Sequence, residues 1–294
     1  MSQAALTARP AGRRTQRRVN NSGATWGSPT TYLIATVLIA ICIAPVLYII
    51  VGGFRTNSQI TVDPSGWPNP WVLKNYTDVL ASELFWRQFS NSVISAVATT
   101  IGTVALALMA SFVIARYDFK GRQGMYALFA AGLMFPMTVA ITPLYLLIKN
   151  IGLTDNLIGI ILPQIAFALP VTVIILVPFL AAIPKELEEA AFIDGASRLG
   201  FFFRMVLPLS LPGVITTGIL AFIGAWNSYI LPLFILNNSD MYTLPLGVQS
   251  FSSEHSVDTA AVLAFTSLSM IPALLFFSIF ERRIVGGLTG AVKG

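Results

Sequence analysis

Long uncharged stretches alternate along the chain with short segments that hold nearly all of the charged residues. The stretches without Asp, Glu, Lys or Arg that can hold a membrane span are 19–54, 88–115, 123–148, 156–184, 205–239 and 259–280. An α-helix needs about 20 mostly apolar residues to cross the hydrocarbon core of a bilayer. The pattern therefore predicts six membrane-spanning helices, over residues 31–53, 88–114, 124–148, 158–181, 210–232 and 260–280.

The composition agrees with a membrane protein. Hydrophobic residues make up 55% of the chain and charged residues 11%, whereas about a quarter of the residues of a soluble domain are charged. We expect an all-α membrane protein with one transmembrane domain over residues 31–280. A flexible tail, residues 1–30, precedes this domain, and a second tail, residues 281–294, follows it.

The basic residues predict which side of the membrane each segment faces. If both termini are cytoplasmic, only Arg55, Lys74, Arg87 and Lys149 of the 18 lysines and arginines lie outside. Because basic residues concentrate in cytoplasmic loops, we expect both termini in the cytoplasm, where the Arg-rich first tail can contact anionic lipid. The net charge of +5 follows from this topology and does not indicate nucleic-acid binding.

The sequence lacks the residues that several kinds of functional site require. A P-loop places glycine directly before its lysine, and glycine precedes none of the lysines of this chain. The only histidine, His255, is predicted in an outer loop without a cysteine near it, which makes a metal site a poor interpretation. No charged residue falls inside the six predicted helices, which weighs against a carrier driven by ions or protons. We expect no enzyme activity, metal or cofactor in this chain itself.

One cytoplasmic segment, residues 184–208, is predicted to form two short helices on the membrane surface. Pro184 can begin a helix whose first turns carry Glu186, Glu188 and Glu189, and carboxylates favour the positive end of a helix dipole. Gly195 can end this helix in a left-handed conformation, and a second helix follows over residues 196–204. The small side chains of residues 190 and 191 allow close approach by another protein. An ordinary amphipathic connection has the same features, so the residues alone leave both interpretations open.

The spacing within this segment resembles a known pattern. Glu189-Ala190-Ala191, then Gly195 and later Leu207-Pro208, resembles the EAA loop of permease subunits in binding-protein-dependent ABC importers. Met205 stands where the usual pattern has isoleucine. Further stretches are similar to the carbohydrate-importer branch, and in particular to the six-helix subunit of the maltose-type permease pair: Asn75-Tyr76, Asn91-Ser92, Ala115-Arg116-Tyr117, Trp226-Asn227 and the last eight residues.

The resemblance implies the type I ABC importer permease fold with a cytoplasmic coupling helix-turn-helix in a bacterial inner membrane. It also implies a second permease subunit, two ATPase subunits that bind ATP and magnesium, and an extracytoplasmic solute-binding protein. Residues at the ATPase would be Glu189, Ala190, Ala191, Asp194 and Gly195 in the coupling loop and Gly290, Lys293 and Gly294 in the C-terminal tail.

Candidates for the substrate path are polar or aromatic residues within the predicted spans: Asn91, Gln164, Trp226 and Asn227. An indole can stack on a sugar and amides can bond its hydroxyl groups, but helix contacts explain the same residues. The outer segments 54–87 and 233–258 are candidates for contact with the solute-binding protein. The alternative function is a membrane scaffold or sensor that tethers an ATPase without transporting a solute.

Overall fold

The computed structural model describes residues 29–251 and 258–292, and the side chains of these ranges up to residue 280. It divides between Pro45 and Val46 into two units, which are described separately. Most of helix α1, Pro29–Gly52, belongs to the first unit, and the helix agrees with the first predicted span. Cys42 and Pro45 lie within this helix. The predicted tail 1–30 lies outside the described residues except for its last two positions, which are helical.

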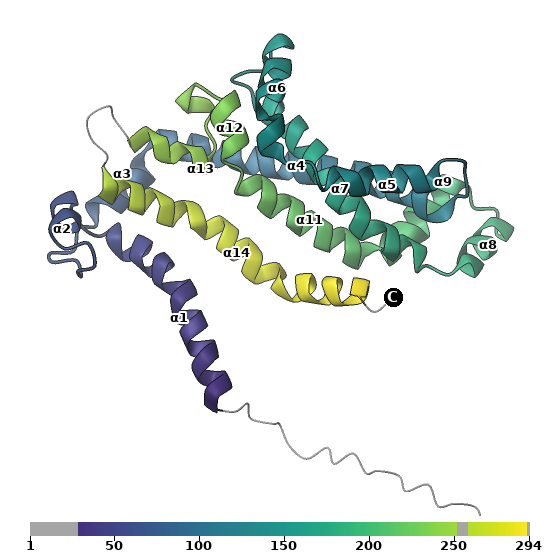
Figure 1. Ribbon diagram of the computed structural model, residues 1–294, viewed down its shortest axis with the longest axis horizontal. Coiled ribbons are helices and arrows are strands. Elements are labelled where there is room, and N and C mark those ends of the chain that lie inside the picture. Colours follow the sequence, from purple (N-terminus) through teal and green to yellow (C-terminus); the bar gives the residue numbers. More distant parts are fainter. Residues whose placement is uncertain (1–28, 252–257, 293–294) are drawn as a thin grey trace, which may run out of the picture. The chain divides into compact units, whose positions relative to one another are not determined.

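The second unit is helical along most of its described length (Figure 1). Its first half contains α2 (Asn57–Val62), α3 (Lys74–Ala81), α4 (Glu83–Arg116), α5 (Arg122–Gly132), α6 (Met137–Asn150) and α7 (Leu157–Ala181). Its second half contains α8 (Lys185–Ile193), α9 (Arg198–Phe201), a π-helical stretch (Phe202–Val206), α10 (Leu207–Leu209), α11 (Leu211–Trp226), α12 (Ile230–Ile235), α13 (Leu244–Gly247) and α14 (Thr259–Val292). Two 3₁₀ turns, Ser239–Met241 and Val248–Phe251, flank α13.

Helix α4 is at the centre of this unit. It packs along α7 and α11, while α5 packs on α7 and α14 packs on α11. Hydroxyl and amide side chains face the interior of this bundle from one side of α4, at Gln88, Ser92, Ser95, Thr99 and Thr103. Their spacing of three or four residues puts them on one helix face, and small polar side chains allow helices in a membrane to pack closely.

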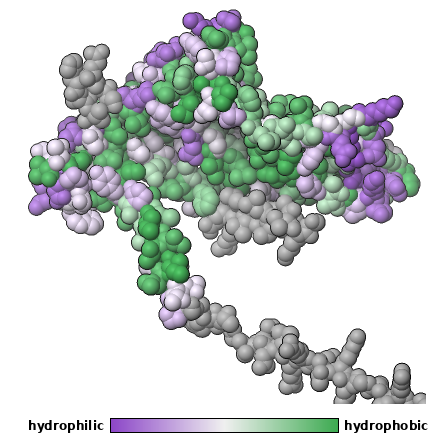
Figure 2. Space-filling view, in the orientation of Figure 1, coloured by the Kyte–Doolittle hydropathy of each residue, from purple (hydrophilic) through white to green (hydrophobic). Residues whose placement is uncertain are grey.

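Polar residues gather at the two ends of this bundle. Figure 2 shows hydrophilic side chains over α2 at one end and over α8 and α9 at the other, with hydrophobic surface between them. Among the described residues, four helices are long and apolar enough to cross a membrane, and two bent helix pairs bring the number to six if each pair is one span. The predicted six-helix pattern thus agrees with the structure at this level.

The third predicted span was wrong as a continuous helix. Residues 124–148 divide into α5 and α6, which meet at an angle of 98° (Figure 1). Pro136 has an extended conformation and caps the start of α6. Proline has no N–H to continue a helix and disfavours the helical conformation in the residue before it, so the break falls at this position.

The fifth predicted span, 210–232, was also wrong in its bounds. Helix α11 ends at Trp226, three non-helical residues follow, and α12 begins at Ile230. At its other end the chain bends by 75° between the segment Arg198–Leu209 and α11. Pro212, in the first turn of α11, explains this bend, because its ring prevents the helix from continuing through Ser210.

The second and sixth predicted spans proved longer than expected. Helix α4 extends to both sides of the predicted span 88–114. Helix α14 begins at Thr259 and continues through Val292, so residues 281–292 of the predicted C-terminal tail are helical. We ended each predicted span near a charged residue, whereas a helix can continue into the membrane–water interface and beyond it.

Candidate functional site

Helix α8 and the turn after it are shaped by local sequence. Pro184 caps the start of α8, and Glu186 and Glu188 lie in its first turn. At the other end Gly195 has a φ of +80°, as predicted. The N–H of Gly195 donates to the carbonyl of Phe192 (3.0 Å) and that of Ala196 donates to the carbonyl of Ala191 (2.9 Å). These two bonds are the Schellman arrangement that ends a helix and turns the chain sharply.

A buried ion pair fixes α8 to the end of α4. Nε and Nη2 of Arg116 both donate to Oε2 of Glu188, at 3.0 and 2.6 Å. Nη1 of the same arginine donates to the carbonyl of Ile183, at 2.5 Å, just before α8 begins. The Arg116 side chain is 2% exposed and the Glu188 side chain 15%. Sequence analysis named both residues without pairing them, because 72 positions separate them.

The outward face of α8 consists of Glu186, Glu189, Ala190 and Ile193, all exposed. Their spacing of three, four and seven residues places them on one side of the helix. Ile193 is 86% exposed. A large exposed apolar side chain beside two carboxylates is typical of a surface that contacts another protein. We define these four residues as the docking face.

Ala191 does not lie on the docking face. This side chain is 7% exposed and packs in the protein's own core, together with the end of α7 and with α9. Successive residues of a helix point about 100° apart, so Ala190 and Ala191 cannot both face a partner. The small side chain of Ala191 instead allows α8 to lie close to the core. Asp194, the C-cap of α8, is exposed beside the docking face.

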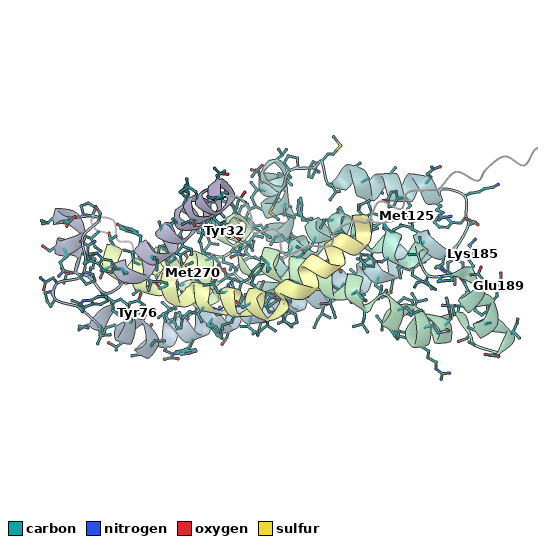
Figure 3. All side chains as sticks on the ribbon, turned by 90° about the horizontal axis from the view of Figure 1, so that it is seen from below. Tyr32, Tyr76, Met125, Lys185, Glu189 and Met270 are labelled. Atoms are coloured by element: carbon teal, nitrogen blue, oxygen red, sulfur yellow. The ribbon has the colours of Figure 1, made fainter. Side chains whose placement is uncertain are left out.

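The second helix of this segment begins with α9 at Arg198, two residues later than predicted, and continues through the π-helical stretch to Leu209. Ser197 caps its start, and the Ser197 hydroxyl accepts a bond from the N–H of Gly200 (3.1 Å). We call this second helix the second arm. The guanidinium of Arg198 lies over the ring of Tyr117, 5.1 Å from its centre, and so ties this arm to α4. Leu199, 71% exposed, adds apolar surface that sequence reasoning missed. Figure 3 shows Lys185 and Glu189 at the end of this unit opposite to Tyr76.

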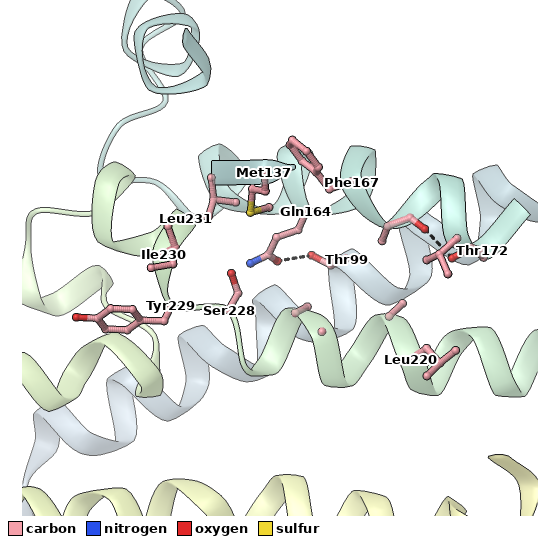
Figure 4. Close-up of a pocket in the computed structure, with 15 residues that line it drawn as sticks. Thr99, Met137, Gln164, Phe167, Thr172, Leu220, Ser228, Tyr229, Ile230 and Leu231 are labelled. Carbon is pink, nitrogen blue, oxygen red and sulfur yellow. Dashed lines mark hydrogen bonds between the residues drawn. The ribbon is translucent and has the colours of Figure 1, made fainter. Parts of the chain in front are cut away.

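A second candidate site is a partly open pocket between helices of the bundle. Its volume is 430 Å³, and residues of α4, α6, α7, α11 and the segment 228–231 line it (Figure 4). Two of the helix breaks border it. Met137 begins α6 after the α5–α6 break, and Ser228 and Tyr229 lie between α11 and α12. Non-helical backbone within a membrane protein is tolerated where it lines such a cavity.

Gln164, on α7, is the predicted path residue that lines this pocket. Its Oε1 accepts bonds from the hydroxyl groups of Thr99 (2.9 Å) and Ser95 (3.3 Å) on α4. Its Nε2 is buried and has no partner among the described residues. Sequence analysis missed Thr99 and Ser95, although hydroxyl residues recurring every three or four positions along 88–103 were a visible signal for a polar face.

The other predicted path residues lie elsewhere. The amide of Asn91 donates to the carbonyls of Asp240 and Tyr242, at 2.8 and 3.0 Å, and so holds the segment between α12 and α13. Trp226 is buried among aromatic and apolar residues of α4, α11 and α14, and does not line the pocket. The exposed amide of Asn227 donates back to Ile223 of its own helix (3.0 Å). None of these three residues lines the pocket, and their place on the substrate path stays a prediction.

Two further predictions concern the termini and metals. Gly290 lies in the helical end of α14, whereas Lys293, Gly294 and His255 lie outside the described residues. Within the described part of the chain, no three His, Cys, Asp or Glu residues gather closely enough to hold a metal ion.

Comparison with known proteins assigns the family. The family described as binding-protein-dependent transport system inner membrane component matches residues 103–286, more than half of the chain. The chain belongs to this family. The matched range begins in α4 and includes α8, most of α14 and every residue that lines the pocket except Thr99.

Several curated relatives are permeases for sugars. The diacetylchitobiose uptake system permease protein NgcG of Streptomyces coelicolor is 34% identical over 85% of this chain and 83% of its own length. The trehalose transport system permease protein SugB of Mycobacterium tuberculosis is 35% identical over 89% of this chain and 96% of its own length. A chain from the crystal structure of a bacterial ABC transporter that imports the acidic polysaccharide alginate has the same fold, with a TM-score of 0.75, 20% identity and coverage of 86% and 94%.

Proposed function

We infer that this transport component is one of two permease subunits of an ATP-driven importer for a carbohydrate. The family and the sugar permeases among its relatives support a carbohydrate as the substrate. A second, related permease would complete the translocation path. Two ATPase subunits would bind ATP and magnesium, and an extracytoplasmic solute-binding protein would deliver the sugar.

The docking face of α8 is the observation that carries this proposal. An exposed isoleucine and two exposed carboxylates lie on a helix that is held rigidly from behind by Arg116 and Glu188. A basic, partly apolar groove on an ATPase subunit is the complementary surface. In this proposal Glu189, Ala190 and Ile193 enter the groove, with Asp194 at its rim, and Gly195 fixes the turn behind them. The C-terminal residues Gly290, Lys293 and Gly294 come near the ATPase pair.

The mechanism follows from how α8 is attached. Closure of two ATPase subunits around ATP moves the docked α8 helices as rigid bodies, and the attached spans follow. The path then changes between inward-facing and outward-facing states, and ATP hydrolysis resets it. The distribution of basic residues supports cytoplasmic termini in a bacterial inner membrane, which places α8 on the same side as the ATPases.

The test is to purify the complex from its native host through a tag on this chain and to reconstitute it in liposomes. Glu189→Arg reverses a charge on the docking face. Asp118→Arg is the matched control, because Asp118 is an acid with a side chain 86% exposed that lies outside α8. We expect Glu189→Arg to release the ATPase and to abolish ATP-dependent sugar uptake, whereas the control keeps both.

Two outcomes would contradict the proposal. If Glu189→Arg retains the ATPase and full uptake, α8 is not the coupling element. If the variant releases the ATPase but the wild-type complex takes up no mono-, di- or oligosaccharide, the chain is better described as a membrane scaffold that tethers an ATPase.

A further inference from the structure

The buried amide of Gln164 contains a hydrogen-bond donor with nothing to bind. Gln164 is 6% exposed, and its Nε2 has no partner among the described residues. Figure 4 shows this nitrogen pointing toward Ser228, into the pocket. Buried polar groups are almost always satisfied, because an unsatisfied donor loses its bonds to water and gains none. An unsatisfied donor that faces a pocket therefore indicates that a ligand supplies the hydrogen-bond acceptor there.

The oxygen end of this amide is bound from the other side. The hydroxyl groups of Thr99 and Ser95 both donate to Oε1, from the neighbouring helix α4. In this orientation the amide presents Nε2, a hydrogen-bond donor, toward the pocket.

The lining of the pocket is uncharged and mostly apolar. Each of the fifteen residues that line it is a neutral side chain or glycine. Met137 and the ring of Phe167 supply apolar surface, and the hydroxyl group of Ser228 lies opposite Gln164. No cationic side chain lines the pocket, so a carboxylate or sulfonate would lose part of its hydration there without gaining an ion pair with this chain. A neutral sugar ring fits, because it offers oxygen acceptors on its edge and C–H groups on its faces.

We propose that this pocket binds one ring of a neutral sugar and that Gln164 Nε2 donates to a hydroxyl or acetamido oxygen of that ring. The inference rests on the proposed function and narrows its substrate to uncharged carbohydrates. The volume of 430 Å³ lies within the range of small-molecule sites, about 300–1,000 Å³. Thr99 and Ser95 are positioning residues that hold the amide in place.

The experiment compares neutral and anionic probes on the reconstituted complex. Trehalose, maltose and diacetylchitobiose are the neutral probes, and alginate oligosaccharides and sulfoquinovosyl glycerol are the anionic ones. We expect uptake of at least one neutral probe and of neither anionic probe. Gln164→Met replaces the amide by an apolar side chain of similar length, and we expect about a tenfold rise in the KM of uptake from the loss of one hydrogen bond.

Two further variants test whether a change in the KM comes from the sugar site or from a general effect on the structure. Gln123→Leu removes an exposed amide from α5, outside the pocket, and we expect it to leave the KM unchanged. Gln164→Asn keeps the amide but withdraws it from the pocket, so it should raise the KM while the complex assembles normally. Basal ATP hydrolysis and recovery of the ATPase subunits report assembly for every variant.

The outcomes separate this inference from the proposed function. If both Gln164 variants take up a neutral sugar with the wild-type KM while Glu189→Arg abolishes uptake, the sugar site is refuted and the importer stands. Uptake of an anionic probe that depends on Gln164 refutes the neutral class. If the wild-type complex takes up no carbohydrate, the proposed function fails, and the sugar site fails with it.

Discussion

The ion pair between Arg116 and Glu188 allows a quantitative prediction of how firmly α8 is attached to α4. Two bonds join the guanidinium to the carboxylate, at 3.0 and 2.6 Å, and a third joins it to the carbonyl of Ile183. Both side chains are largely withdrawn from solvent. Removing one partner of such a pair leaves the other charge buried and unpaired, which is far more costly than losing an exposed pair.

Glu188→Ala is therefore expected to destabilise the attachment of α8 to α4. Breaking a buried ion pair costs about 3–5 kcal/mol, and we expect about 3 kcal/mol here because the carboxylate retains some contact with solvent. This free energy corresponds to an increase of about a hundredfold in local opening, since about 1.4 kcal/mol is a factor of ten. Asp78→Ala is the matched control. It removes an exposed pair with Lys74, for which about 1 kcal/mol or less is expected.

Hydrogen exchange of the purified complex in lipid nanodiscs measures this opening. We expect peptides covering residues 185–197 to exchange about a hundredfold faster in Glu188→Ala, with α7 and the centre of α4 unchanged. In Asp78→Ala, exchange over α3 should rise by no more than about fivefold. An equal rise in both variants, or a rise spread evenly over α4 and α7, would refute the reasoning that a buried pair holds α8.

Two further predictions concern single turns of the chain. Gly195→Ala should lower the free energy of unfolding by about 1–2 kcal/mol, because only glycine adopts a left-handed conformation without a steric penalty. Gly124→Ala is the control and should be neutral or stabilising. Neither glycine has a neighbour within 4 Å of an added Cβ, so steric contact does not distinguish the two positions. Equal losses of stability in thermal unfolding would contradict this explanation. The carboxylate of Asp155 accepts bonds from the N–H groups of Asn237 (2.5 Å) and Asn238 (2.8 Å), which lower its pKa. This contribution to stability is present at neutral pH and is lost as pH falls below about 4 and through the lowered pKa, so the difference in melting temperature between wild type and Asp155→Ala should shrink as pH falls through this range.

Interactions between residues close in sequence explain which features of α8 could be predicted. Proline before a helix, acids in its first turn and a glycine after it act within a few residues, so both ends of α8 could be placed from sequence. Which side of α8 faces a partner depends on Arg116, far away in the sequence, and on the core that receives Ala191. Hydrophobic pattern alone could not distinguish Ala191 from Ala190.

The breaks in the spans were harder to predict for a different reason. Hydropathy depends on composition within a window, and the residues around Pro136 are as apolar as those of a continuous helix, while the two polar residues Asn227 and Ser228 are outweighed by their apolar neighbours in such a window. Whether a proline kinks a helix or ends it is decided by what satisfies the freed backbone groups, and this requires the neighbouring helices. The pocket beside these breaks was therefore invisible to the hydrophobic pattern, although Gln164 itself was not.

The two candidate sites are connected through α4. The same helix holds the Gln164 amide through Thr99 and holds α8 through Arg116, and these two residues are about 25 Å apart along a helix rising 1.5 Å per residue. Helix α7 carries Gln164 and leads into Ile183, whose carbonyl Arg116 also binds. A movement imposed on α8 therefore reaches α4 and the end of α7 together. Helices α6 and α12, which follow breaks in the chain, both line the pocket and pack together with α7 in one hydrophobic cluster. We therefore expect a displacement of α8 to reach the pocket through α4 and α7, the two helices that carry Thr99 and Gln164.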